Sequence, residues 1–189
     1  MKKILASLVV FAATTTLASA QRPELRPEIR PFAGVYLPTG TQRDLFDNAA
    51  KFGVQAALEL RPSFHVLGTF GYVPGQTKYV SAKNDVQIFQ YDVGVEFNML
   101  RPIGDMWLFK PFVGAGAGAR SYFYDNSALT DRTCAAGYGA LGMEFELNRA
   151  AIRLEGRDNV FCFRSALPNI KSSTRNDIDF SLGLAYHFK

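Results

Sequence analysis

Three residues with the chemistry of a hydrolytic triad share one face of the stretch at residues 176–188. Asp179, Ser181 and His187 are separated by even numbers of residues, so their side chains point to the same side of an extended chain. At about 3.3 Å per residue, however, Ser181 and His187 lie roughly 20 Å apart along the strand. A nucleophile and its base must be within hydrogen-bond reach. The sequence therefore predicts that this face is not an active site and that the chain is not an enzyme.

A metal or phosphate site is not predicted either. The chain has two histidines, His65 and His187, and neither stands in a cluster of cysteines or carboxylates at ligand spacing. Gly114, Gly116 and Gly118 could belong to a phosphate-binding loop, but such a loop opens a helix, whereas this run continues the alternation of a strand. We expect these glycines to be spacers, and we expect no cofactor.

Charged side chains recur at every second position of several stretches, between apolar residues. Glu144 and Arg153 are equally far from the two-residue turn at 148–149, and we expect them to pair. Removing one partner of a buried pair is costly, so charges of this kind are balanced. We predict an ion network in the lumen of a barrel, formed by Glu144, Arg153, Glu155, Arg157, Asp177 and Asp179.

Cys134 and Cys162 are the two cysteines of the chain. Counting from the turn at 148–149 places them at nearly equal height on adjacent strands. The phase that pairs Glu144 with Arg153 nevertheless puts them on opposite faces, so a disulfide needs a bulge or loop geometry at this point. Exported chains meet oxidising conditions, and two cysteines permit one pairing. We predict a disulfide between them.

Eight stretches with a period of two must position these residues. Such alternation is that of a β-strand with one apolar and one polar face. The last stretch is long enough to cross a bilayer at a tilt, which takes about 9–11 residues. The predicted strands lie at residues 32–37, 51–60, 64–73, 86–97, 107–124, 135–147, 151–160 and 176–188.

The connections between these strands alternate in length. Short turns at one end and longer loops at the other, with an even number of strands, are typical of outer-membrane barrels. An eight-stranded barrel has room inside only for side chains, so the numerous large aromatic residues belong outside. This argues against the alternative, a soluble lipocalin-like barrel with an apolar interior. We predict an all-β fold, a transmembrane eight-stranded antiparallel up-and-down β-barrel.

The first residues predict export. Lys2 and Lys3 precede an apolar run and a set of small residues that ends at Ala20, which is the pattern of a signal peptide. The formal net charge is +4, but acidic residues are interleaved throughout and no basic run exists, so no nucleic-acid partner is predicted. The expected organisation is a signal peptide at 1–20, a proline-rich leader outside the sheet at 21–31, and an outer-membrane barrel at 32–189.

The last strand also resembles that of a known family. Ser181 is followed two residues later by Gly183, and aromatic residues, Tyr186 and Phe188, stand three and five positions after the glycine. On these residues the chain resembles the OmpA/OmpX-like family of eight-stranded outer-membrane β-barrels, although Lys189 follows where the aromatic residue is usually last. The resemblance implies that the barrel assembly machinery reads this segment as an insertion signal. It also implies a location in outer-membrane lipid of a Gram-negative-type bacterium.

Function is predicted only in outline. We expect a structural or envelope-integrity role, or an interaction between the surface loops and an extracellular ligand that the sequence does not identify. Because some relatives in the family are enzymes on lipids, a lipid-modifying enzyme is one alternative, and a small-solute channel is another. The balanced interior charges argue against a large stable pore.

Overall fold

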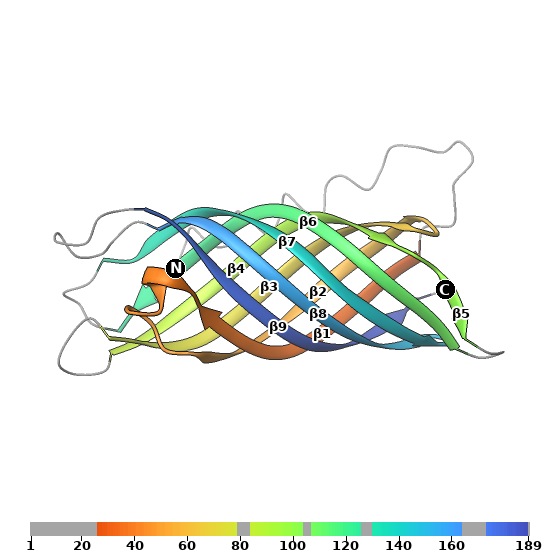
Figure 1. The fold of residues 1–189 in the computed structure, drawn as a ribbon, viewed down its shortest axis with the longest axis horizontal. Coiled ribbons are helices and arrows are strands. Elements are labelled where there is room, and N and C mark those ends of the chain that lie inside the picture. The colour runs from red at the N-terminus through yellow and green to blue at the C-terminus, as the bar shows by residue number, and fades with distance from the viewer. Residues whose placement is uncertain (1–25, 79–83, 104–106, 126–129, 164–172, 189) are drawn as a thin grey trace, which may run out of the picture.

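The computed structural model describes residues 26–78, 84–103, 107–125, 130–163 and 173–188 (Figure 1). Within these residues, no helix is both long enough and apolar enough to span a membrane. The elements are β1 (Arg26–Pro38), the 3-10 turn η2 (Gly40–Gln42), β2 (Ala49–Arg61), β3 (Phe64–Thr77), β4 (Asn84–Asn98), β5 (Arg101–Ile103), β6 (Trp107–Tyr124), β7 (Arg132–Leu147), β8 (Ala150–Phe163) and β9 (Ser173–His187).

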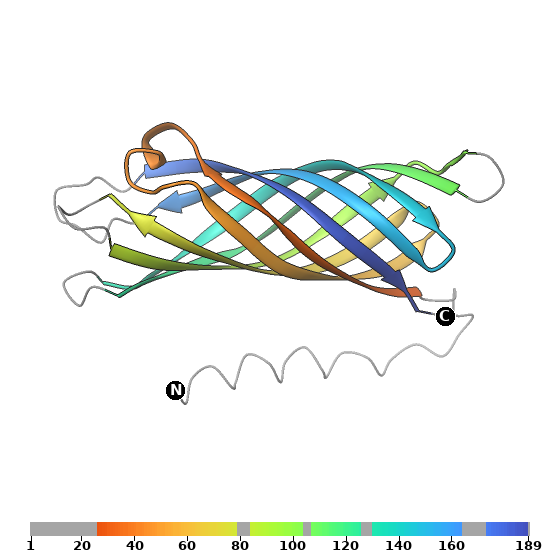
Figure 2. The same cartoon turned by 90° about the horizontal axis from the view of Figure 1, so that it is seen from below.

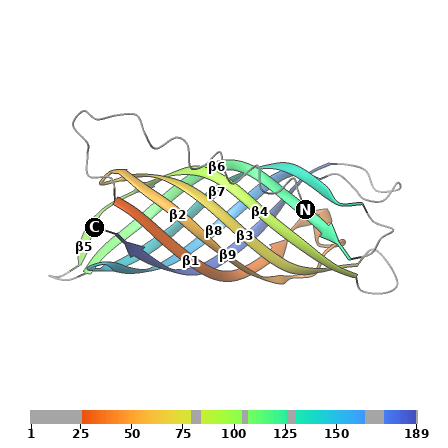
Figure 3. The same cartoon turned by 180° about the vertical axis from the view of Figure 1, so that it is seen from behind.

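The long strands form one closed barrel. They pair in antiparallel fashion in the order β4-β3-β2-β1-β9-β8-β7-β6, and a further ladder between β4 and β6 joins the two edges of this sheet. The short β5 pairs with β6 at one end of the barrel (Figures 1 and 3). The described residues therefore confirm the predicted eight-stranded antiparallel up-and-down barrel.

The barrel carries its apolar side chains outside and its polar side chains inside. On β9, Phe180, Leu182 and Leu184 are 53%, 55% and 63% exposed, whereas Asp177 and Asp179 are buried. This alternation follows from the period of two along a strand. A soluble protein would bury the apolar set, whereas an outward apolar band is what a bilayer requires of a barrel. The predicted transmembrane orientation of the faces is confirmed.

The tight hairpins gather at one end of the barrel, which we call the turn end. Residues 62–63 join β2 to β3, and residues 148–149 join β7 to β8. Asn148 has a φ of 60°, a left-handed conformation that asparagine tolerates in a tight hairpin. The start of β1 and the end of β9 lie at the same end. The opposite end, the loop end, carries η2 together with the ends of β3, β6 and β8 and the starts of β4, β7 and β9 (Figure 2).

The first strand begins earlier than predicted. β1 starts at Arg26, so residues 26–31, predicted to form a leader outside the sheet, pair with β2 and β9. Proline has no backbone N–H, and the two prolines are tolerated because they stand where the β1–β9 ladder ends or is interrupted. Pro27 accepts a hydrogen bond from the backbone N–H of Phe188, just beyond β9, and Pro31 falls at a gap in the β1–β9 ladder. The predicted signal peptide and the rest of the predicted leader lie outside the described residues.

The interior has an apolar part that the sequence analysis did not predict. It lies near the loop end and is formed by Tyr36, Phe46, Val73, Val86, Ile88, Tyr122 and Phe161. Phe46 belongs to the connection between β1 and β2, which folds into the mouth of the barrel and forms a β-bridge with Thr77. In the same connection, Gln42 is fully buried and accepts a hydrogen bond from Arg175 Nη1 at 2.7 Å. The connection thereby covers the loop end of the interior.

Candidate functional site

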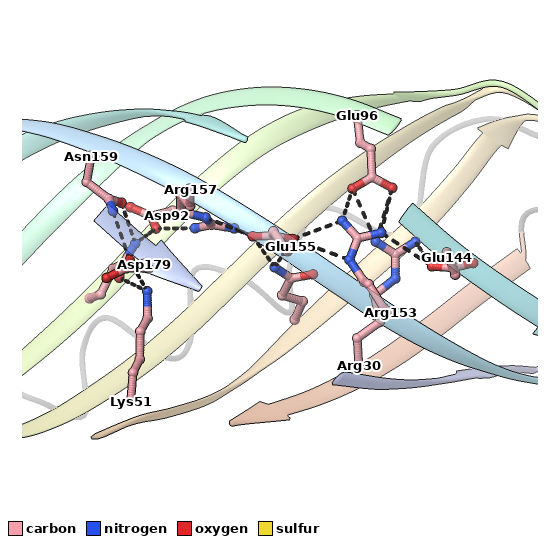
Figure 4. Close-up of polar contacts among 12 residues, drawn as sticks. Arg30, Lys51, Asp92, Glu96, Glu144, Arg153, Glu155, Arg157, Asn159 and Asp179 are labelled. Carbon is pink, nitrogen blue, oxygen red and sulfur yellow. Dashed lines mark hydrogen bonds and ion pairs between the residues drawn. The ribbon is translucent and has the colours of Figure 1, made fainter. Parts of the chain in front are cut away.

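Arg153 on β8 is the centre of an ion network in the turn-end half of the interior (Figure 4). Its guanidinium donates to Glu96, Glu144 and Glu155, with N–O distances of 3.2 Å, 3.3 Å and 2.9 Å. Glu96 belongs to β4, which is not a neighbour of β8 in the sheet, so this ion pair crosses the lumen.

Glu96 lies between two guanidinium groups. In addition to the bonds from Arg153, its Oε1 accepts a hydrogen bond from Arg30 Nη1 at 3.2 Å, and Arg30 Nη2 donates to Glu28 Oε2 at 2.7 Å. All four side chains are buried. Charge-assisted hydrogen bonds are roughly twice as strong as neutral ones. Each of these buried charged side chains therefore relies on its ion-pair partners for stability inside the barrel.

The network continues toward the loop end through Arg157. Its Nε donates to Glu155 Oε1 at 2.9 Å, and its Nη1 donates to Asp92 Oδ2 at 3.0 Å. The side-chain amide of Gln90 donates to Asp92 and, at 3.2 Å, to Asn159 Oδ1. Polar contacts thus run without interruption from the turn end to the middle of β8 and β9.

Two aspartates of β9 complete the network toward the loop end. Asp179 accepts hydrogen bonds from Lys51 and, at 2.8 Å, from Asn159 Nδ2 of β8. Asp177 Oδ2 accepts hydrogen bonds from Arg120 Nη1 and from Tyr36 Oη, both at 2.6 Å. Since Tyr36 also belongs to the apolar cluster, the charged and apolar parts of the interior are in direct contact.

Aromatic rings support the interior arginines. The Cζ atom of Arg153 lies 3.5 Å from the ring centroid of Phe112, and that of Arg157 lies 4.0 Å from the ring centroid of Tyr138, both distances at which a cation is attracted to the ring face. A Cβ atom on Gly116 would overlap Tyr138, which faces it from β7. Gly116 is therefore a spacer, as predicted, and it makes room for a side chain of the adjacent strand.

The structure places all six residues of the predicted ion network inside the barrel, and Glu144 Oε2 lies 3.3 Å from Arg153 Nη1 across the β7–β8 hairpin. Further members were not assigned to the network from the sequence. The signal available in the sequence was the alternation along each strand, because each of these residues falls on the polar face. Glu28 and Arg30 were missed because their segment was assigned to the leader. These further members are Glu28, Arg30, Lys51, Gln55, Gln90, Asp92, Glu96, Arg120 and Asn159.

The predicted disulfide is not formed. Cys134 and Cys162 are free thiols, and Cys134 is buried whereas Cys162 is exposed. Residues of adjacent strands that differ by one position in register point to opposite faces. The β7–β8 ladder runs from Ala136 to Leu147 without a shift in register, so no bulge brings the two thiols to one side.

The four residues of the predicted insertion signal lie on both faces of β9. Ser181 and Gly183 are on the inner face, whereas Tyr186 and Phe188 are exposed on the outer face with their ring centroids 5.0 Å apart. The aromatic pair is therefore presented at the turn end, where β9 stops. Recognition of this segment by the barrel assembly machinery stays a prediction.

The turn end of the interior opens into a hollow of about 950 Å³. Its lining includes Lys110, Glu146 and His187. His187 pairs with Glu28 of β1, whereas Ser181 pairs with Gly34 further along that strand, so the serine and the histidine lie at different heights in the barrel. Lys110 connects this lining to the ion network, because its Nζ forms an ion pair with Glu146 and lies 3.8 Å from Glu144 Oε1.

Neither a family model nor a curated protein sequence matches this chain. Solved structures do. The chain is similar to Neisserial surface protein A, with 10% identity over 86% of this chain and 97% of that protein and a TM-score of 0.63. It is also similar to the outer membrane protein OprG of Pseudomonas aeruginosa, with 15% identity over 89% of this chain and 98% of that protein and a TM-score of 0.57.

A third similar structure is the N-terminal β-barrel domain of OprF from Pseudomonas aeruginosa, with 12% identity, 86% and 97% of the two chains covered, and a TM-score of 0.52. At these identities the similarity concerns the fold alone. Together with the closed barrel and its apolar outer surface, it confirms at the level of the fold the resemblance to OmpA/OmpX-like outer-membrane barrels.

Proposed function

We propose that this chain, which has the fold of the eight-stranded outer-membrane β-barrels, is an integral outer-membrane protein whose lumen is closed by its own side chains. Its role would then be structural, in envelope integrity, or would be carried out by its surface loops toward an extracellular ligand. The observation that supports this proposal is the continuous network of buried ion pairs and hydrogen bonds from Glu28 and Glu144 to Asp177.

The dimensions of the interior favour closure. An eight-stranded barrel is just wide enough for side chains to fill it. The hollow within the network, between Arg30, Gln55 and Arg153, measures about 10 Å³. That volume is room for about one water molecule at most. A hydrated solute would have to displace several paired charges, each of which would lose its partner.

The apolar cluster supports closure a second time at the loop end. Phe46 and Tyr122 lie with their ring centroids 5.8 Å apart, and both are 1% exposed. A solute that passed the ion network would therefore meet an apolar layer, which offers no hydrogen bonds to replace its hydration. The ion network disfavours an apolar solute and the apolar cluster disfavours a polar one, so neither kind of solute would pass both layers.

The alternatives are disfavoured by particular arrangements. A small-solute channel requires a polar path along the whole axis, which the apolar cluster interrupts. A lipid-modifying enzyme requires a nucleophile within hydrogen-bond reach of its base, and Ser181 lies apart from His187 on β9. We therefore propose that the protein is not an enzyme. The lipid of the outer membrane is the partner that its apolar surface suits.

Planar-bilayer recordings test the closed lumen. We expect the purified barrel to show no steady conductance of porin size. A variant with Arg30→Ala, Glu96→Ala and Arg153→Ala, combined with Phe46→Ala, removes side chains from both closing layers and should conduct more than the parent protein. Leu154→Ala, on the outer face, is the matched control and should not conduct. A parent protein with steady porin-sized conductance would contradict the proposal.

A further inference from the structure

Three side chains from three strands meet at the turn end of the lumen. They are Glu28 of β1, Glu144 of β7 and His187 of β9. One carboxylate oxygen of each glutamate and one ring nitrogen of His187 all lie within 4.8 Å of one another. We propose that these residues bind a divalent transition-metal ion of the Zn²⁺ class. The sequence predicted no metal site, because the three positions are far apart along the chain.

The free atoms of these side chains point to the same place. Glu28 uses Oε2 to accept a hydrogen bond from Arg30, and Glu144 uses Oε2 to accept one from Arg153. Their Oε1 atoms are buried without a hydrogen-bond partner, although the glutamates are only 2% and 1% exposed. The Nε2 atom of His187 is also buried without a hydrogen-bond partner and lies 3.7 Å from Glu28 Oε1.

Such a cluster needs a ligand for a physical reason. A buried polar atom without a partner is destabilising, and buried polar atoms are therefore nearly always satisfied. Two carboxylate oxygens and an imidazole nitrogen are a donor set that suits Zn²⁺. Arg30 and Arg153 hold the other carboxylate oxygens, which is the supporting role that outer partners have around metal ligands.

Lys110 is the cation that competes with a metal ion at this position. Its Nζ lies 3.8 Å from Glu144 Oε1 and also forms an ion pair with Glu146. Glu146 Oε2 is in turn 3.9 Å from His187 Nε2. A bound metal ion would take Glu144 from Lys110, while Glu146 would keep the lysine paired. Removal of the lysine charge should therefore strengthen metal binding.

An ion has access to the cluster. The hollow of about 950 Å³ at the turn end is lined by His187, Lys110 and Glu146. In outer-membrane barrels the short turns face the periplasm. Metal ions would therefore enter from the periplasmic side, without crossing the ion network or the apolar cluster.

The position of the cluster assigns a role to the metal ion. Glu28 and His187 face each other across the ladder between β1 and β9, which is where the first and last strands close the barrel. A metal ion bound there would link this seam to β7. The inference goes beyond the proposed function, because a closed lumen does not require the metal ion.

Zn²⁺ titration of the full barrel, folded in detergent micelles and stripped with a chelator, tests the site. Calorimetry should show one saturable ion per barrel, and Zn²⁺ should raise the melting temperature. His187→Gln and Glu28→Gln should each weaken binding by more than about 100-fold, because loss of a ligand exceeds the effect of losing an outer partner. Leu184→Ala, on the outer face of the same strand as His187, is the control with unchanged affinity.

Further measurements keep the test decisive if a ligand variant does not fold. Co²⁺ bound to the parent protein should give visible absorption bands typical of nitrogen and oxygen ligands, and Lys110→Met should bind Zn²⁺ more tightly than the parent. The proposal is overturned if the parent binds no Zn²⁺ with saturation, which would leave His187 as a neighbour of Glu28 without a metal ion. Equal binding by parent, His187→Gln and Glu28→Gln would overturn it as well.

Discussion

Arg153→Met is the substitution that most directly tests the energetics of the lumen. Methionine keeps an apolar chain against Phe112 but removes the charge that Glu96, Glu144 and Glu155 share. Removing one partner of a buried ion pair costs about 3–5 kcal/mol. Because three buried carboxylates lose a donor at once, we expect a loss of unfolding free energy near the upper value, about 5 kcal/mol.

Urea unfolding in detergent or lipid measures this loss. The chain has a single tryptophan, Trp107, which is 42% exposed on the outer face and reports contact with the apolar phase. With a slope of about 2 kcal/mol per molar urea, the midpoint should fall by about 2 M or more. Leu154→Ala, the adjacent outward-facing position, is the control and should shift the midpoint less.

A double-mutant cycle shows whether the charges act as a network. Glu96→Gln removes one of the carboxylates that Arg153→Met leaves behind, so the double variant should lose less free energy than the sum of the two single variants. A cost below about 1 kcal/mol for Arg153→Met, as for an exposed ion pair, would refute the reasoning. Strict additivity in the cycle would refute it as well.

The remaining predictions concern the thiols, the glycines and the last strand. Intact mass should be identical with and without reductant, and a maleimide should label Cys162 in the folded barrel but Cys134 only after unfolding; a mass difference of two hydrogens would contradict this. Gly116→Ala should lower the free energy of unfolding by about 1–3 kcal/mol through overpacking. Gly139→Ala is the control and should not, because no atom lies within 4 Å of the new Cβ. Equal melting temperatures of the two variants would show that the room left by Gly116 is not required. Phe188→Ala should reduce the amount of folded barrel in the outer membrane of cells but not its folding into detergent micelles. Unchanged assembly in cells would contradict the prediction that Phe188 is part of an insertion signal.

Local sequence was sufficient for the strands and for the two faces of the barrel. The alternation around Asp179, Phe180 and Ser181 sets which side chains enter the lumen, whatever the neighbouring strands are. The same parity placed Glu144 opposite Arg153, since a two-residue turn leaves only one register for the hairpin. It also contained the argument against the disulfide, because Cys134 and Cys162 have opposite phase; the expectation drawn from oxidising conditions was wrong.

Other features depended on the neighbours of a segment. The prolines of residues 26–31 suggested a leader, yet this segment joins the sheet, since Pro27 and Pro31 lie outside the paired positions of the β1–β9 ladder. The apolar cluster at the loop end was equally hidden, since Phe46 lies in a connection without strand periodicity and becomes buried only when that connection folds into the mouth.

Apart from the hairpin pair of Glu144 and Arg153, only the tertiary structure decided which interior charges meet. Arg30 and Glu96 are 66 residues apart in the sequence and share a hydrogen bond, and Glu28, Glu144 and His187 converge from three strands. The sequence by itself determined which side chains point inward, because parity is a property of each strand alone. The height at which two inward side chains come together is set by the tilt and stagger of all strands around the closed barrel, and no single segment carries that information.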